Sequence, residues 1–266
     1  MKNILFITML LGALYSQDCN PDYNNCDCNE DTWQEYYNSE GHNMEGCYLY
    51  GANLQGTNFA GAWLNLANLA GADLAGANFT GATLNMVDLA GANLIQANLE
   101  RADLTWAHLE EANLYQTTLV LANLWLANLS GADLTGAILD GTYLNQANFT
   151  GSDLSGAWLA GANLNQTNFT GADLSGAMLI GTDLWWADLS GADFTNTNCN
   201  GAFFVNTTLD NTIFDGANLN YAYFDENDDQ YDDVSYDAGA ESGDLNLDGA
   251  GDVLDVVILV NNIINP

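Results

Sequence analysis

The chain has 266 residues, and 35 acidic side chains against only 2 Lys and Arg give it a formal net charge of −33 at pH 7. This balance excludes an ordinary nucleic-acid-binding surface, since no basic patch is present to meet phosphate, and it disfavours docking on anionic membranes. Hydrophobic residues make up 48% of the chain, as in globular proteins, and the 2 His leave little for acid–base or zinc catalysis, so we expect no catalytic residues.

The N-terminus has the pattern of a secretory signal peptide. Lys2 supplies a positive charge, an apolar run extends from Ile4 to Leu14, and Ser16 is a small residue before the chain turns polar. The run is too short to span a bilayer well, so the pattern predicts export, with cleavage after Ser16, and no transmembrane span in the mature chain. A buried first helix is the alternative. We expect a secreted or cell-surface protein.

Residues 17–46 are rich in cysteine, and we predict that they cap the repeats that follow. Four cysteines are candidates for disulfides, and they allow three pairings: Cys19, Cys26, Cys28 and Cys47. A metal site is disfavoured, because the single residue between Cys26 and Cys28 is fewer than a zinc knuckle uses. Thr32 and Glu35 have the spacing of a capping box, so residues 31–37 are expected to form a short helix.

Residues 47–226 repeat every five residues. The central residue of the 36 successive units is Leu in 27, Phe in 8 and Cys in one, Cys199, and the residue two before it is Ala in 25 and Thr in 8. A strand would place residues five apart on opposite faces, and a helix would spread them around its surface. Only a coil that turns one corner per unit keeps every central residue inside, so the period predicts a solenoid.

The eight central Phe residues indicate how many units close one turn. They form four pairs, each 20 residues apart: Phe59 and Phe79, Phe149 and Phe169, Phe194 and Phe214, Phe204 and Phe224. A large ring inside a narrow tube needs room from the residue stacked on it, and two rings stack favourably. We therefore predict a turn of four units, which gives about nine coils and, at a strand spacing of about 4.8 Å, a tube about 43 Å long.

Units such as residues 71–75 (GADLA), 91–95 (GANLI) and 131–135 (GADLT) resemble the pentapeptide-repeat family, whose pattern is Ala-(Asp/Asn)-Leu-X-X. The resemblance covers about two thirds of the chain. It implies an all-β solenoid, a right-handed quadrilateral β-helix, in which the central residue and the small residue point inward and the other three point outward. It implies no enzymatic activity.

A 20-residue turn gathers outward aromatic side chains on one face. Trp158 lies on the adjoining face. Eight aromatic residues share the first face: Trp63, Trp106, Trp125, Tyr143, Trp185, Trp186, Phe203 and Tyr223. An exposed apolar stripe often marks an interface, so we predict a binding face for a protein, a second copy of the chain or a glycan. The alternative is that single outward aromatic residues are ordinary on a solenoid.

Two acidic features receive a plainer interpretation. Asp133, Asp153, Asp173 and Asp193 occupy one outward position in successive coils. Such a column could bind cations, but we favour the interpretation that each carboxylate hydrogen-bonds its own turn. His108, with Glu110 and Glu111 nearby, is interpreted as a solvated side chain rather than a catalyst.

Residues 227–242 are an acidic linker, and residues 243–266 have the pattern of a calcium loop followed by an apolar helix from Val253 to Ile264. Oxygen ligands fall at loop positions 1, 3, 5, 7, 9 and 12: Asp244, Asn246, Asp248, Ala250 through its carbonyl, Asp252 and Asp255. The expected cofactor is Ca²⁺. The run from Asp244 to Ile264 resembles one half of a dockerin, which implies a cohesin-like receptor; dockerins carry two such segments, and here there is one.

These patterns together predict an exported, calcium-binding, non-enzymatic scaffold that presents an aromatic face. Two alternatives are open. The dockerin-like tail would suit an accessory component of extracellular polysaccharide degradation. The charge and shape would suit a DNA mimic, as in pentapeptide-repeat proteins that protect type II topoisomerases, although the signal peptide argues against that function.

Overall fold

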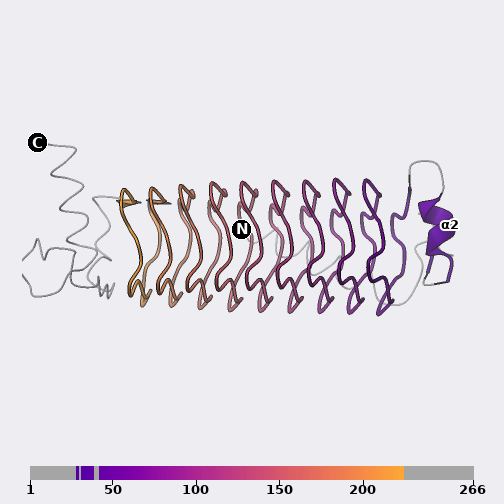
Figure 1. The fold of residues 1–266 in the computed structure, drawn as a ribbon, viewed down its shortest axis with the longest axis horizontal. Helices are drawn as coiled ribbons and strands as arrows, with labels where there is room; N and C mark the ends of the chain where they lie inside the picture. The colour runs from indigo at the N-terminus through magenta and orange to yellow at the C-terminus, as the bar shows by residue number, and fades with distance from the viewer. Residues whose placement is uncertain (1–27, 30, 39–41, 225–266) are drawn as a thin grey trace, which may run out of the picture.

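In the computed structural model, residues 28–29, 31–38 and 42–224 are described, and they form a short cap followed by a regular tube (Figure 1). Within these ranges no helix is long and apolar enough to cross a membrane. Several predicted features lie outside the described residues: the signal peptide at 1–16, Cys19, Cys26, the linker at 227–242 and the calcium segment at 243–266.

Every five-residue unit of the tube has the same local structure. The small residue closes a turn by donating its N–H to the previous central residue, as from Ala72 to the carbonyl of Leu69 at 3.0 Å. The residue just before it takes a positive φ, for example 64° at Gly71, which a turn of this kind requires and which glycine adopts without strain. Glycine occupies 20 of the 36 such positions.

Successive turns pair through parallel bridges between residues 20 apart, from Asn43–Trp63 to Phe203–Tyr223. Two of these pairings extend into strands, β1 (Phe203–Phe204) and β2 (Tyr223–Phe224), which lie parallel in one two-stranded sheet. The bridges use both backbone groups: Asp73 donates its N–H to Ala52 in the turn before, and Leu74 donates to Asn93 in the turn after. The predicted 20-residue turn is therefore confirmed.

The central residues fill the axis of the tube, where all 36 are buried. The four Phe pairs stack as predicted, with ring centroids 5.0 Å apart in three pairs and 4.7 Å apart for Phe204 and Phe224. Buried threonines at the small position donate their hydroxyl to a backbone carbonyl, as Thr117 does to Leu94 at 2.7 Å. This hydrogen bond explains why Thr can replace Ala inside an apolar tube.

The N-terminal end of the tube is covered by helix α2 (Trp33–Tyr37), which stands over the first turns in Figure 1. The ring of Trp33 packs 5.3 Å from that of Phe59, and Tyr37 meets the same phenyl ring edge-on at 6.2 Å. A disulfide joins Cys28 to Cys47, which is one of the pairings that the sequence left open. The cap therefore shields the end of the phenylalanine stack.

The start of α2 differs from the predicted capping box. The N–H of Glu35 donates to the backbone carbonyl of Thr32 at 2.9 Å, and the Thr32 hydroxyl accepts instead from the N–H of Asn29 at 3.1 Å. Asn29 also accepts the N–H of Asp31 on its side chain. Asn29 therefore organises the first turn of the helix, because its carbonyl also accepts the N–H groups of Thr32 and Trp33.

Candidate binding face

One side of the tube carries four aromatic residues in its column of bridging positions. We call this column the aromatic side; its members are Asn43, Trp63, Thr83, Asp103, Asn123, Tyr143, Asn163, Asp183, Phe203 and Tyr223. All four aromatic members are exposed, because a bridging side chain points away from the axis. The bridges thus place four of the nine predicted face residues in one line.

Four further aromatic residues lie on the turns that follow this side, which we call the aromatic corner (residues 45–46, 65–66 and so on to 205–206). Trp125 and Trp185 are first turn residues, and Trp106 and Trp186 are second turn residues. Trp106 is only partly exposed, because its ring packs against Trp125 with centroids 6.2 Å apart at 68°. Trp158 lies on the adjoining side, where it bridges Ile138 and Met178.

The aromatic corner is nearly free of glycine where the backbone favours it. At the other three corners 19 of 27 second turn residues are glycine, whereas here Gly46 is followed by large or polar side chains: Leu66, Met86, Trp106, Leu126, Gln146, Gln166, Trp186 and Asn206. A left-handed backbone costs an ordinary residue roughly 1–2 kcal/mol. Large side chains at positions where they destabilise the backbone indicate that the surface they form has a function. The absence of glycine at a 20-residue interval could have revealed this surface in the sequence.

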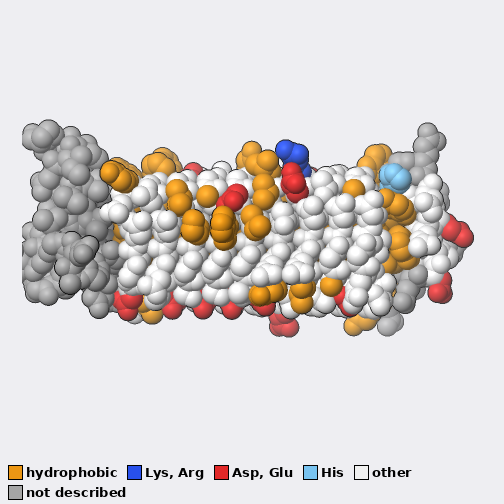
Figure 2. All heavy atoms as spheres, in the orientation of Figure 1, with side chains coloured by type: hydrophobic (Ala, Val, Ile, Leu, Met, Phe, Trp, Pro, Cys, Tyr) orange, Lys and Arg blue, Asp and Glu red, His pale blue; other side chains and the backbone are white. Residues whose placement is uncertain are grey.

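A hollow of about 450 Å³ lies across the aromatic side between two corners. It draws on three successive turns, and its lining residues are Arg101, Ala102, Asp103, Leu121, Asn123, Trp125, Tyr143 and Asn145. Figure 2 shows hydrophobic side chains gathered on the face toward the viewer, in part beside the basic side chain, and carboxylates along the lower edge. The hollow was not predicted from the sequence.

The acidic column lies on the side opposite the aromatic one. Asp133, Asp153, Asp173 and Asp193 bridge one another in successive turns. Each carboxylate accepts the N–H two residues ahead, at 2.8–2.9 Å, which confirms the interpretation that it binds its own turn. In the part of the chain that the structure describes, no cluster of three or more His, Cys, Asp or Glu residues is placed to hold a metal ion.

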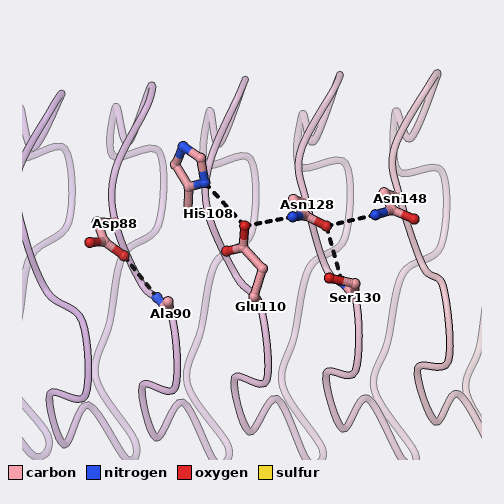
Figure 3. A network of polar contacts seen from close by, with 7 residues as sticks. All are labelled: Asp88, Ala90, His108, Glu110, Asn128, Ser130 and Asn148. Atoms are coloured by element: carbon pink, nitrogen blue, oxygen red, sulfur yellow. Dashed lines mark hydrogen bonds and ion pairs between the residues drawn. The ribbon is translucent and has the colours of Figure 1, made fainter. Parts of the chain in front are cut away.

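His108 belongs to a polar chain along the outside of the tube (Figure 3). Its Nδ1 lies 3.2 Å from Oε1 of Glu110, and that oxygen also accepts from Asn128 of the next turn, which in turn accepts from Asn148. The hydrogen bond to Glu110 raises the pKa of His108 although burial opposes this. Burial works against ionisation of Glu110, but the hydrogen bonds from His108 and Asn128 help to lower its pKa.

We predict that Glu110→Gln lowers the pKa of His108, measured from the pH dependence of its imidazole resonances by NMR. The pair stabilises the fold by less than about 1 kcal/mol, since both side chains are partly exposed. That contribution is lost as pH rises through the raised pKa of His108, and again as pH falls through the lowered pKa of Glu110. Glu111→Gln is the matched control; an equal effect of both variants would contradict the contact.

The comparisons with known proteins agree with this architecture. The family model for pentapeptide repeats matches in eight copies, over residues 43–85, 88–125, 127–166, 159–196 and 187–224. The solved structure of HetL, a pentapeptide repeat protein involved in heterocyst differentiation regulation from the cyanobacterium Nostoc sp. strain PCC 7120, is 30% identical over 71% of this chain and 90% of its own, with a TM-score of 0.31.

Two other solved structures also match the chain. QnrB1, a plasmid-mediated fluoroquinolone resistance protein, is 23% identical over 69% of this chain and 87% of its own, with a TM-score of 0.49. A pentapeptide repeat protein from the Arabidopsis thaliana thylakoid lumen is 24% identical over 56% of this chain and 68% of its own, with a TM-score of 0.21. No curated protein matches the chain significantly.

Proposed function

The chain belongs to the pentapeptide-repeat family, and we propose that it is an exported, non-enzymatic scaffold whose aromatic side and aromatic corner bind a protein or a glycan outside the cell. The observation that carries the proposal is the aromatic corner, where large side chains replace glycine at left-handed positions. A scaffold that only had to fold would be more stable with glycine there. The tube, by stacking identical turns, provides a rigid and elongated support for such a surface.

The proposal includes the finer features predicted from the sequence. They are a right-handed β-helix of about nine coils, export directed by residues 1–16, and a calcium-dependent attachment element at residues 243–266. The proposed Ca²⁺ ligands are Asp244, Asn246, Asp248, Ala250, Asp252 and Asp255. If residues 243–266 bind a receptor and the aromatic side and corner bind a second molecule, the chain would hold the two close together.

The test is affinity capture of partners from the extracellular fraction of the source culture by the full chain, with and without calcium. We predict that Trp186→Gly weakens capture through the aromatic corner while raising the free energy of unfolding by about 1 kcal/mol, because glycine relieves the left-handed strain. A loss of binding with a gain of stability cannot be attributed to misfolding.

Gln116→Gly is the matched control for this variant. Gln116 has a left-handed backbone as well, with φ of 53°, but lies on the corner diagonally opposite the aromatic one. It should gain similar stability without a change in capture. Equal capture by wild type, Trp186→Gly and Trp185→Ser would argue against the aromatic corner, and capture that ignores calcium would argue against the attachment role of the tail.

A further inference from the structure

We propose that the hollow on the aromatic side binds the sugar rings of a neutral polysaccharide. This inference rests on the binding role proposed above and names the ligand class of one part of the face. The hollow is open on its outer side, and its volume of about 450 Å³ lies within the range of roughly 300–1,000 Å³ that small-ligand sites occupy.

The wall of the hollow is formed by two residues that stand where this corner usually has glycine. Arg101 and Leu121 are second turn residues with φ of 57°, on a corner where the turns before and after them carry glycine. Leu121 also leans over the next turn, since its Cδ2 lies 2.9 Å from where a Cβ on Gly141 would stand. Two strained residues in successive turns line the same hollow, which indicates that the shape of the hollow has a function.

The floor of the hollow is polar and held in place. Oδ1 of Asp103 accepts the N–H and the hydroxyl of Thr105, at 3.2 and 2.6 Å, and the amide nitrogen of Asn123 at 3.1 Å. With its amide oriented toward Asp103, Asn85 donates to both carboxylate oxygens at 3.1 and 3.2 Å. Fixed carboxylate and amide groups suit the hydroxyls of a sugar, because they need no reorganisation on binding.

Two aromatic rings flank this floor. Trp125 is exposed, but its orientation is fixed because its indole packs against Trp106. Its backbone N–H also donates to the side-chain oxygen of Asn123 at 3.2 Å. Tyr143 stands one turn further along, exposed beside the floor. The C–H groups of a pyranose ring carry partial positive charge and stack on the negative faces of such rings. Aromatic rings beside planar hydrogen-bonding groups are therefore complementary to both surfaces of a sugar.

Charge selects against other ligands. The net charge of −33 repels polyanions such as nucleic acids and polyuronates. Arg101, the only Lys or Arg among the described residues, lies at the rim with its side chain 66% exposed and paired with Glu100 at 3.3 Å. A neutral chain does not meet the repulsion that polyanions meet, and the guanidinium can donate to its hydroxyls.

A peptide strand would find no backbone partner here. Peptides that bind as an added β-strand pair with a free sheet edge. Along the hollow the groups such a strand would use are already engaged between turns, as Leu104 donates to Asn123 and Leu124 donates to Tyr143. The turns instead repeat at about 4.8 Å along the tube, so an elongated ligand can contact several successive turns.

The experiment is affinity electrophoresis of the full chain in gels containing hydroxyethylcellulose, xylan or galactomannan, with polygalacturonate as the anionic comparison. We expect at least one neutral polymer to retard wild type. Trp125→Ala should weaken that binding by about tenfold, the loss of one stacked ring. Tyr115→Ala removes an exposed aromatic ring from the corner diagonally opposite the aromatic one and should leave binding unchanged.

Arg101→Gly separates an effect on glycan binding from an effect on the stability of the tube. It restores the glycine of that corner and should stabilise the tube, yet weaken retardation. Absence of retardation in every neutral gel, or an equal loss in Trp125→Ala and Tyr115→Ala, would overturn the inference. If retardation is absent while Trp186→Gly still loses partner capture, the aromatic face binds a protein and only the glycan assignment fails; if both are absent, the proposed function fails as well.

Discussion

Phe169→Ala is expected to lower the free energy of unfolding by about 3–5 kcal/mol. The ring is fully buried and stacks on Phe149 of the preceding turn, 5.0 Å away and 13° from parallel. Alanine would leave a cavity that the walls cannot close, because the backbone beside it is fixed in both directions: Phe169 donates to Asp188, and Asn168 donates to Ala147. The cost should therefore lie near the upper part of the range for buried aromatic residues.

Urea denaturation followed by far-ultraviolet circular dichroism measures this loss, and hydrogen exchange locates it. Because each turn of a solenoid contacts its neighbours alone, the loss of protection should centre on the turns from 149 to 189. Phe203→Ala is the control: this ring is exposed, and its removal should change stability by less than about 0.5 kcal/mol.

A double variant with Phe149→Ala tests the stack itself. The two losses should fall short of additivity by about 0.5–1.5 kcal/mol, the contribution of the ring pair. If Phe169→Ala were no more harmful than Phe203→Ala, or if the two buried positions were additive, the stacked axis would not be what stabilises the tube.

The 20-residue turn could be predicted because its cause is steric and leaves a mark in the sequence. Rings such as Phe59 and Phe79 fit the axis only when stacked, so their spacing reports the length of a turn. Burial of the central and small positions follows from the same constraint. The disulfide did not follow, since several pairings of the cysteines satisfied the spacing, and only the placement of Cys28 beside the first unit selects Cys47.

The candidate site could be predicted only in outline. Periodicity assigned Trp106 and Trp125 to one face, but the contact that partly buries Trp106 depends on rotamers that no repeat pattern encodes. The hollow depends in the same way on Leu121 leaning over Gly141. The left-handed corner was encoded, however: Leu, Met and Trp recur at a position where glycine is the ordinary residue, and sorting by glycine as well as by aromatic residues would have identified it.

The cap is the second place where one change should have a large effect. Cys28→Ala with Cys47→Ala should destabilise the docked cap by about 3 kcal/mol, because the disulfide closes a loop with a sequence separation of 19. Alanine is suited to position 47, since it fills the equivalent position of most units, so the pair of substitutions removes the crosslink and little else. The variant and the reference protein should both carry Cys19→Ser and Cys26→Ser, so that no alternative disulfide forms.

Hydrogen exchange of residues 33–38 measures the effect, and protection there should fall by about 100-fold for 3 kcal/mol. The turns beyond 149 serve as the internal control and should keep their protection, because a solenoid transmits little from its end. Unchanged protection at residues 33–38 would mean that Trp33 and Tyr37, packed on Phe59, hold the cap without the crosslink.

Loss of the cap should also change how the protein associates. Releasing α2 uncovers Phe59 and the first turn, whose backbone then has no neighbour on its outer side among the described residues. Such an edge pairs readily with another copy. Sedimentation velocity should therefore show concentration-dependent association of the Cys28→Ala, Cys47→Ala protein that the disulfide-bonded protein lacks. Association by this route joins tubes end to end, so Trp186→Gly, which alters the aromatic corner, should not suppress it.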